Sequence, residues 1–189
     1  MPSQAKRFNT VLLVGLGNPG MEFDATRHNV GFHILDTFVD DTWSQEKAHK
    51  ALSANTTVDG VTVHLLKPQT FMNLSGEAVQ SYASYYKIPV EAILVIHDEA
   101  DLPFGDIRLK QGGGTAGHNG LKSLVQRLGT DTFWRLRFGI GRGDNPNVTL
   151  ENFVLAKWTE SEQQQLDQLV QQTLHKLHEF IVAPPQDHS

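Results

Sequence analysis

The chain has 189 residues, 39% of them hydrophobic and 20% charged, and its formal net charge at pH 7 is −5. This length and composition predict one globular domain with a sizeable buried core. The acidic balance argues against a protein that coats nucleic acid in general. The absence of cysteine excludes disulfides, thiol nucleophiles and cysteine zinc sites.

The apolar segments are too short for a targeting or membrane role. The first of them, residues 11–16, is broken by the Gly-Asn-Pro-Gly turn of residues 17–20, so it does not resemble the core of a secretion signal. No stretch approaches the roughly 20 apolar residues that span a bilayer. We therefore expect a cytoplasmic protein that does not enter the membrane.

Hydrophobic spacing and turn signals alternate between strand and helix patterns along the first half of the chain. Continuous apolar runs predict buried strands, and the Asp59-Gly60 pair between two β-rich runs predicts a hairpin. In chain order the predicted elements are a strand over residues 10–16, a helix over 30–39 with Asn29 as N-cap, hairpin strands over 53–58 and 61–66, and a helix over 75–87 with Ser75 as N-cap.

The second half continues the alternation and ends in the clearest helix. Thr159 and Glu162 form a capping box there, and Pro184-Pro185 stops the helix. The predicted elements are strands over residues 92–97, 106–110 and 134–140, a helix over 120–128 with Asn119 as N-cap and Gly129 at its end, and a helix over 159–182.

This order of elements predicts one α/β domain over residues 1–189, with a core of about 10–182 and short flexible ends. We expect a mixed, mostly parallel, twisted sheet that is flanked by helices on both faces.

A glycine motif follows the first predicted strand. Residues 15–20 match the dinucleotide-binding pattern G-x-G-x-x-G, but the next residues are polar and lack helical periodicity up to Asn29. The fingerprint needs a helix at its last glycines and an acid at the end of a second strand. The alternative is a turn that presents Asn18 at the carboxyl edge of the sheet, where α/β folds place their ligands.

A second glycine-rich stretch precedes the helix predicted over residues 120–128. Gly112-Gly113-Gly114 resembles a phosphate loop, but Leu121 separates Gly120 from Lys122, so the P-loop spacing fails. Such a loop still allows close approach of the backbone to a ligand. Asn119 is either a helix cap or a ligand contact, and the two roles can coexist.

Basic residues are concentrated in one segment. Residues 107–142 hold seven basic residues and one acid, a charge of +6, so the rest of the chain carries −11. Such asymmetry indicates either an anionic-ligand face or a solvated surface. The basic residues are Arg108, Lys110, Lys122, Arg127, Arg135, Arg137 and Arg142.

A polar cluster, residues 97–101, closes the strand predicted over residues 92–97, and His28 lies in the polar loop before the first helix. No metal-ligand spacing joins the cluster, so we do not expect a metal. If His28 faces Asp98, the carboxylate would accept one ring N–H and leave the other nitrogen free to take a proton. The chain has no cysteine and no G-x-S-x-G elbow, which favours water as the nucleophile.

Six sequence blocks occur together between residue 11 and about residue 142. They are VGLGNPG at residues 14–20, TRHN at 26–29, KPQTFMNLSG at 67–76, HDEADLP at 97–103, the glycine run 112–114 with GHNGLK at 117–122, and RLRFGIG at 135–141. In this order they resemble bacterial peptidyl-tRNA hydrolase.

The resemblance implies hydrolysis of the ester between a peptide and the 3′ end of tRNA, which releases free peptide and reusable tRNA. It implies a single α/β domain that is monomeric and uses no metal or organic cofactor. The partner would be peptidyl-tRNA, contacted at its acceptor stem and 3′ end, with no role for DNA or a membrane.

The resemblance also implies individual roles. His28 would be the general base, Asp98 would orient it, and Asn18 would lie beside the scissile bond and help to tell a blocked amino group from a free one. The substrate and tRNA contacts implied are Asn73 and Asn119 on the substrate backbone and 3′ end, Phe71 and Met72 along the groove, Lys110 and Arg137 on the 5′ phosphate with support from Arg108 and Arg142, and Phe23.

Two departures from the family pattern affect these expectations. Phe23 stands where the family usually has tyrosine, so a ring can still stack on a base or ribose but a hydroxyl contact is lost. The chain after Arg142 matches less clearly, and no individual roles are transferred there.

Two other classes of function stay open on the sequence. A non-catalytic RNA- or ribosome-binding protein would keep the basic segment without needing His28 and Asp98. A nucleotide-dependent oxidoreductase would use the glycine motif of residues 15–20.

Overall fold

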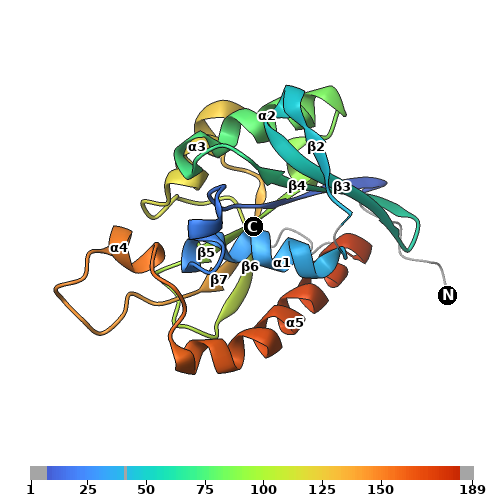
Figure 1. Cartoon of the computed structure of the whole chain (residues 1–189). Helices are drawn as coiled ribbons and strands as arrows, with labels where there is room; N and C mark the ends of the chain where they lie inside the picture. The colour runs from blue at the N-terminus through green and yellow to red at the C-terminus, as the bar shows by residue number, and fades with distance from the viewer. Residues whose placement is uncertain (1–7, 41, 184–189) are drawn as a thin grey trace.

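The computed structural model describes residues 8–40 and 42–183, and structural statements below refer to this part of the chain. A seven-stranded sheet in the order β2-β3-β4-β1-β5-β7-β6 forms its centre (Figure 1). The strands are β1 (Thr10–Gly15), β2 (Ser44–Glu46), β3 (Ala51–Val58), β4 (Val61–Pro68), β5 (Ile93–Glu99), β6 (Ile107–Gln111) and β7 (Trp134–Gly139).

The helices divide between the two faces of this sheet, with the long α5 on one side and α2 and α3 on the other (Figure 1). The α-helices are α1 (Val30–Phe38), α2 (Ser75–Tyr85), α3 (Asn119–Leu128), α4 (Leu150–Val154) and α5 (Glu160–Val182). Short 3-10 helices are η1 (Met21–Phe23), η2 (Arg27–Asn29), η3 (Lys47–His49), η4 (Met72–Leu74) and η5 (Val90–Ala92). None of the described helices is long and apolar enough to cross a membrane.

The sheet is mixed, as predicted, with its parallel strands in the middle. β1 pairs in parallel with β4 and β5, and β5 pairs in parallel with β7. The pairs β2–β3, β3–β4 and β6–β7 are antiparallel. Parallel and antiparallel pairs are thus equal in number among the described strands, because the hairpin and two edge strands extend a parallel core of four strands.

Two hydrophobic cores explain the layers. One core joins α1 and α5 to the sheet face that carries Leu13 and Ile96, and the other joins α2 and α3 to the face that carries Val14 and Val95. β1 and β5 are apolar on both faces because they are covered on both, which is typical of central parallel strands. The continuous apolar runs predicted this arrangement.

Every strand and helix predicted from the sequence is present within a few residues of its expected bounds. The sequence patterns missed β2 and α4, which are only three and five residues long. The Thr159–Glu162 capping box is confirmed, and Gly129 ends α3 in the left-handed conformation. The expected stop at Pro184-Pro185 lies outside the described residues.

Two of the three predicted helix caps were wrong, and the third, Asn29, is confirmed in position only. Ser75 is the first residue inside α2, and its hydroxyl donates to the Met72 carbonyl. The N-cap of α3 is His118 rather than Asn119. Asn29 occupies the N-cap position of α1, but its side chain does not bond to the helix. The Asn29 side chain bonds to Asn18 instead, so there a tertiary contact outweighs the local preference for a polar cap.

α1 lies directly against the carboxyl ends of β1 and β5. A Cβ on Gly31 would meet the Ile96 carbonyl oxygen at 2.5 Å and the Leu16 nitrogen at 2.5 Å. Only glycine allows this approach, because both neighbours are backbone atoms that cannot move aside. The close contact sets η2 and its His28 beside the end of β5, where Asp98 lies.

Candidate functional site

A cavity of about 390 Å³ opens at the carboxyl edge of the parallel strands. This is the edge at which open α/β sheets bind ligands. The lining residues are Asn18, His28, Phe71, Met72, Asn73, Asp98, Glu99, Ala100, Thr115, Ala116, Gly117, His118, Asn119, Leu150, Glu151, Val154 and Leu155.

The Asp98 carboxylate lies between two imidazoles at the floor of this cavity. His28 Nδ1 donates to Asp98 Oδ2 at 2.9 Å and lies 3.0 Å from Oδ1. His118 Nε2 donates to Oδ1 at 2.9 Å. The Asp98 side chain is only 2% exposed, so these hydrogen bonds take the place of water around a buried charge. The contact between His28 and Asp98 that the sequence left open is therefore present.

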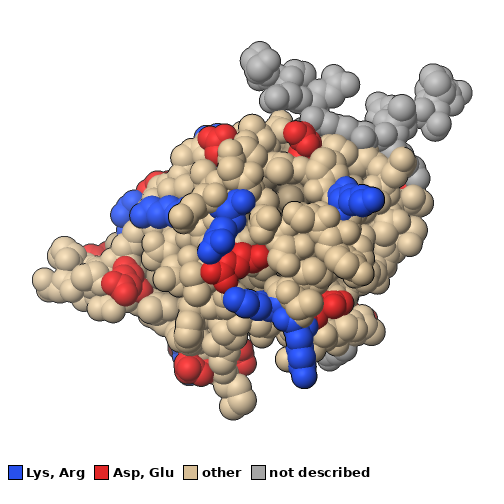
Figure 2. All heavy atoms as spheres, turned by 90° about the horizontal axis from the view of Figure 1, so that it is seen from above, with Lys and Arg blue, Asp and Glu red and all other residues tan. Residues whose placement is uncertain are grey.

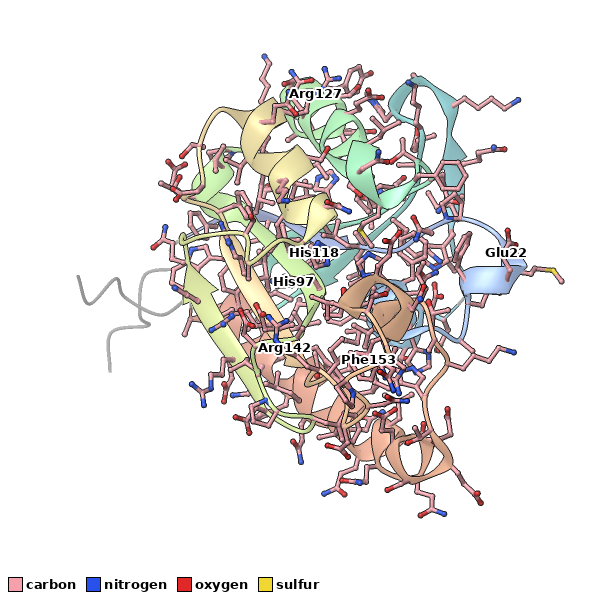
Figure 3. All side chains as sticks on the ribbon, turned by 90° about the vertical axis from the view of Figure 1, so that its left-hand side faces the viewer. Glu22, His97, His118, Arg127, Arg142 and Phe153 are labelled. Atoms are coloured by element: carbon pink, nitrogen blue, oxygen red, sulfur yellow. The ribbon has the colours of Figure 1, made fainter. Side chains whose placement is uncertain are left out.

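The backbone of α3 fixes the tautomer of His118. Its Nδ1 accepts the N–H groups of Gly120 and Leu121 at 3.1 and 3.3 Å, so this nitrogen carries no proton. The ring proton must then be on Nε2, where it is donated to Asp98. His118 is thus a neutral donor that holds the carboxylate in place. Figure 3 shows it beside His97, with Phe153 farther toward α5.

The same groups are the cluster in the described chain that could hold a metal ion, since one ligand atom each of His28, Asp98 and His118 lies within 4.8 Å of the others. The tautomer of His118 opposes this use, because the nitrogen that faces Asp98 carries the proton. The geometry therefore fits a hydrogen-bonded relay better than a coordination site.

Burial and charge act in opposite directions on the titration of this cluster. Burial alone would lower the pKa of His28, but the Asp98 carboxylate outweighs it and raises that pKa above the ordinary 6.5. Burial would raise the pKa of Asp98, but the two imidazoles hold it well below its usual range. Burial, followed by the field of His118, lowers the pKa of His97 to about 3. Asp98 is thus ionised and His97 neutral near pH 7.

His28 combines a fixed proton with a free lone pair. Since Nδ1–H is donated to Asp98, the lone pair is on Nε2. The side chain is 11% exposed and lines the cavity. This is the arrangement of a general base that is oriented by a carboxylate.

Asn18 is held on both its backbone and its side chain. Its N–H donates to Asn29 Oδ1 at 2.8 Å, and its carbonyl accepts from Asn29 Nδ2 at 2.9 Å. Its Oδ1 accepts the Met72 N–H at 2.7 Å. With its oxygen engaged in this way, Asn18 offers its amide N–H groups to the cavity as donors. Asn29 occupies the expected N-cap position of α1, but its side chain holds Asn18 and does not bond to the helix.

The other expected substrate contacts divide into those inside the cavity and one outside it. Asn73, in η4, and Asn119, at the start of α3, are exposed in the cavity lining, while Phe71 is 61% exposed and Met72 is buried. Phe23 is in η1 and does not line this cavity; its carbonyl accepts the Thr26 hydroxyl. Whether Phe23 contacts a ligand thus stays a prediction.

Lys110 and Arg137 line a second, smaller cavity of about 180 Å³. It shares Glu99 and Ala116 with the larger cavity, so the two lie side by side. Arg137 Nε donates to Glu99 Oε2 at 3.2 Å, and Lys110 is exposed on β6. The sheet therefore brings both expected phosphate contacts to one place next to the cavity that His28 lines.

The register of β6 and β7 sets like charges directly opposite one another. Arg108 faces Arg137, and Lys110 faces Arg135. Like charges in directly opposed pairs are destabilising, which indicates a functional use of this face. Arg135, however, is buried and donates to the carbonyls of Gly113 and Gly114, so it holds the glycine loop.

Charges on the α2–α3 side of the molecule are interspersed. Figure 2 shows Lys and Arg separated by Asp and Glu on this side. On this side Arg127 pairs with Glu77, and away from it, after β7, Arg142 pairs with Asp101 at 2.6 Å. Lys110, Arg135 and Arg137 on β6 and β7, here called the β6–β7 strip, are the basic residues that line the smaller cavity, so we expect an anionic ligand there and not over every basic residue of the segment.

Sequence reasoning missed three parts of the site. His118 and Arg27 lie within the recognised motifs, but no role was predicted for either residue. The region of α4, which supplies Leu150, Glu151 and Val154 to the cavity wall, was given no role at all. The available signal was weak, because a histidine cap and a five-residue helix have no distinctive spacing.

Comparisons with known proteins agree on one family. The family model described as "Peptidyl-tRNA hydrolase" matches residues 12–187. Peptidyl-tRNA hydrolase of Bordetella avium is 46% identical over 164 residues, which cover 84% of this chain and 79% of that protein. Peptidyl-tRNA hydrolase of Nitratidesulfovibrio vulgaris is 48% identical over 170 residues, with 84% of each chain covered.

Solved structures give the same result. The crystal structure of peptidyl-tRNA hydrolase from Acinetobacter baumannii has 40% sequence identity and a TM-score of 0.85, over 92% of this chain and 89% of that one. Identity and fold thus agree over most of both chains.

We predict that the substitution Asp98→Asn lowers the pKa of His28. The carboxylate raises that pKa against the effect of burial, so its removal leaves burial to lower it. Titration of the histidine rings by NMR measures the change, with His97 as an internal reference that stays neutral near pH 7 in both proteins. An unchanged or higher pKa for His28 would show that Asp98 does not control the ring.

Proposed function

Because the chain belongs to the peptidyl-tRNA hydrolase family, we propose that its larger cavity hydrolyses the ester that joins a peptide to the 3′ ribose of tRNA, with His28 as the base that activates water. The chain is a hydrolase of the aminoacyl-tRNA hydrolase class. The observation that supports His28 as the base is its Nδ1–H donation to the buried Asp98, which leaves Nε2 toward the cavity.

The proposed reaction begins with a water on His28 Nε2. As the water oxygen attacks the ester carbonyl carbon, Nε2 takes the proton, and Asp98 stabilises the imidazolium that forms. Collapse of the tetrahedral intermediate breaks the bond to the ribose 3′ oxygen, and the proton on Nε2 passes to that oxygen. The products are a peptide carboxylic acid and tRNA with a free 3′ hydroxyl.

Asn18 is the donor for the charge that develops on the carbonyl oxygen. Met72 engages its side-chain oxygen, so an amide N–H can be offered without a change of rotamer. A pre-oriented donor of this kind contributes roughly 3–4 kcal/mol to transition-state stabilisation. Asn73 and Asn119, on the rim, can bind the peptide backbone and the 3′ end through both donor and acceptor groups.

The smaller cavity suits the phosphate end of the acceptor stem. Lys110 and Arg137 offer positive charge there, next to the ester-binding cavity. Phosphate contacts position a nucleic acid without reading its sequence, which suits an enzyme that must accept many tRNAs. Phe23 remains a candidate for stacking on a base or ribose. A monomeric state, a cytoplasmic location and a reaction without cofactors complete the proposal.

The two competing functions are less well supported. A binding protein would not need the buried Asp98 between two imidazoles, since buried charge is costly without a use. A dinucleotide site would need a helix at residues 15–20, whereas a three-residue 3-10 helix follows Gly20.

His28→Ala should abolish release of an N-acetylated aminoacyl group from tRNA while largely sparing tRNA binding. Loss of a general base costs about 10² to 10⁴ in rate, and the β6–β7 strip that would bind phosphate is untouched. Release is measured with N-acetylated and free aminoacyl-tRNA side by side, and the wild type should release only the blocked group. His33→Ala, on the exposed side of α1, is the matched control.

Near-normal release by the His28→Ala protein would refute the assignment of the base. If folded wild-type protein binds tRNA but releases no aminoacyl group, the result would instead favour the hypothesis of a non-catalytic RNA-binding protein.

Lys110→Ala and Arg137→Ala should each weaken tRNA binding and reduce the dependence of affinity on salt. Each lost phosphate contact reduces the slope of log affinity against log salt by about 0.7 to 0.9. Lys176→Ala, on α5 across the sheet, removes one positive charge as a control. Slopes that match the wild type in both test variants would exclude the phosphate role.

A further inference from the structure

Arg27 is a buried cation that the proposed reaction does not use. It immediately precedes His28 in η2, and only 3% of it is exposed. A charge that is so deeply buried must be paired and hydrogen-bonded. Its partners come from two segments more than 120 residues away in sequence, α4 and the start of α5.

The contacts with α4 supply hydrogen-bond donors to backbone carbonyls at the end of a helix that is too short to be stable alone. Arg27 Nη1 donates to the Phe153 carbonyl at 3.0 Å, and the guanidinium lies 4.0 Å from the centroid of the Phe153 ring. The Arg27 N–H donates to the Ala156 carbonyl at 3.1 Å. A cation at the last carbonyls of a helix is favourable, and a five-residue helix depends on such outside contacts.

The contacts with α5 fix the guanidinium from its other side. Arg27 Nη2 donates to Glu162 Oε2 at 2.9 Å and to Oε1 at 3.2 Å. Glu162 Oε2 also accepts the Thr159 N–H as part of the capping box of α5. Glu162 is therefore held by the helix start, and Arg27 is held by Glu162.

These contacts connect the segment that contains His28 to another part of the cavity wall. α4 and the residue after it give Leu150, Glu151, Val154 and Leu155 to the lining, to which His28 also belongs. In Figure 3, Phe153 lies between His118 and α5. We propose that Arg27 is a positioning residue that holds α4 as the substrate-binding wall at a fixed distance from His28. The inference rests on the proposed function.

The loss of this anchor should affect binding more than chemistry. Arg27 does not contact the His28–Asp98 pair through its side chain, so Arg27→Met should raise KM for N-acetylaminoacyl-tRNA about tenfold and keep kcat within about twofold. The pH profile of kcat should not move. Arg27→Lys, which cannot contact Phe153 and Glu162 together, should give a smaller increase in KM.

Hydrogen exchange gives a readout that does not depend on activity. In Arg27→Met the amides of residues 150–156 should exchange at least about tenfold faster, while those of α3 keep their rates. Val79→Ala, on the buried side of α2, is the control for lost stability, since Val79 is fully buried in the core on the other face of the sheet. It should lower the unfolding temperature without a change in KM or in α4 exchange.

A second variant covers the case in which Arg27→Met does not fold. Glu162→Gln removes the charge opposite Arg27 but keeps an acceptor for the Thr159 N–H, and it should raise both KM and α4 exchange. Unchanged KM and exchange in whichever variant folds would overturn the inference, as would an equal increase in KM for Val79→Ala. A wild type without hydrolase activity would refute the proposed function, while the exchange experiment would still decide whether Arg27 anchors α4.

Discussion

The buried Asp98 carboxylate, shared by the imidazoles of His28 and His118, is the interaction on which the rest of the site depends. An ionised carboxylate in the interior requires hydrogen bonds from all sides. His118 can supply one because α3 fixes its tautomer, and His28 supplies the other. The need to satisfy this one charge therefore determines which nitrogen of His28 carries the proton and which nitrogen faces the cavity.

The fold brings these groups together through two adjacent parallel strands. β1 leads to Asn18 and the η2 segment, β5 ends at Asp98, and Gly31 allows α1 to lie against both strand ends. The antiparallel pair β6–β7 extends the same sheet and carries Lys110 and Arg137 beside the cavity. The proposed base, oxyanion donor and phosphate contacts thus lie along one edge of the sheet, an arrangement that favours preorganisation over adjustment on binding.

Much of this could be predicted from the sequence, because buried strands and amphipathic helices have distinctive periods. Periodicity and spacing could not predict the contact between His28 and Asp98, which only the family resemblance implied, since the residues are 70 positions apart and meet because β1 and β5 are neighbours. Local propensity was also an incomplete guide to the helix caps. It favoured Asn119, whereas His118 caps α3, and it placed Asn29 correctly at the start of α1 but did not predict that its side chain holds Asn18.

The dependence of kcat on pH, compared between the wild type and Asp98→Asn, tests the central claim most directly. The wild-type rate should fall as acid protonates His28, whose pKa the carboxylate raises. The Asp98→Asn rate should be lower at every pH, and its acid limb should lie at lower pH because the substitution lowers that pKa. An acid limb at the same pH in both proteins would contradict a His28 base controlled by Asp98.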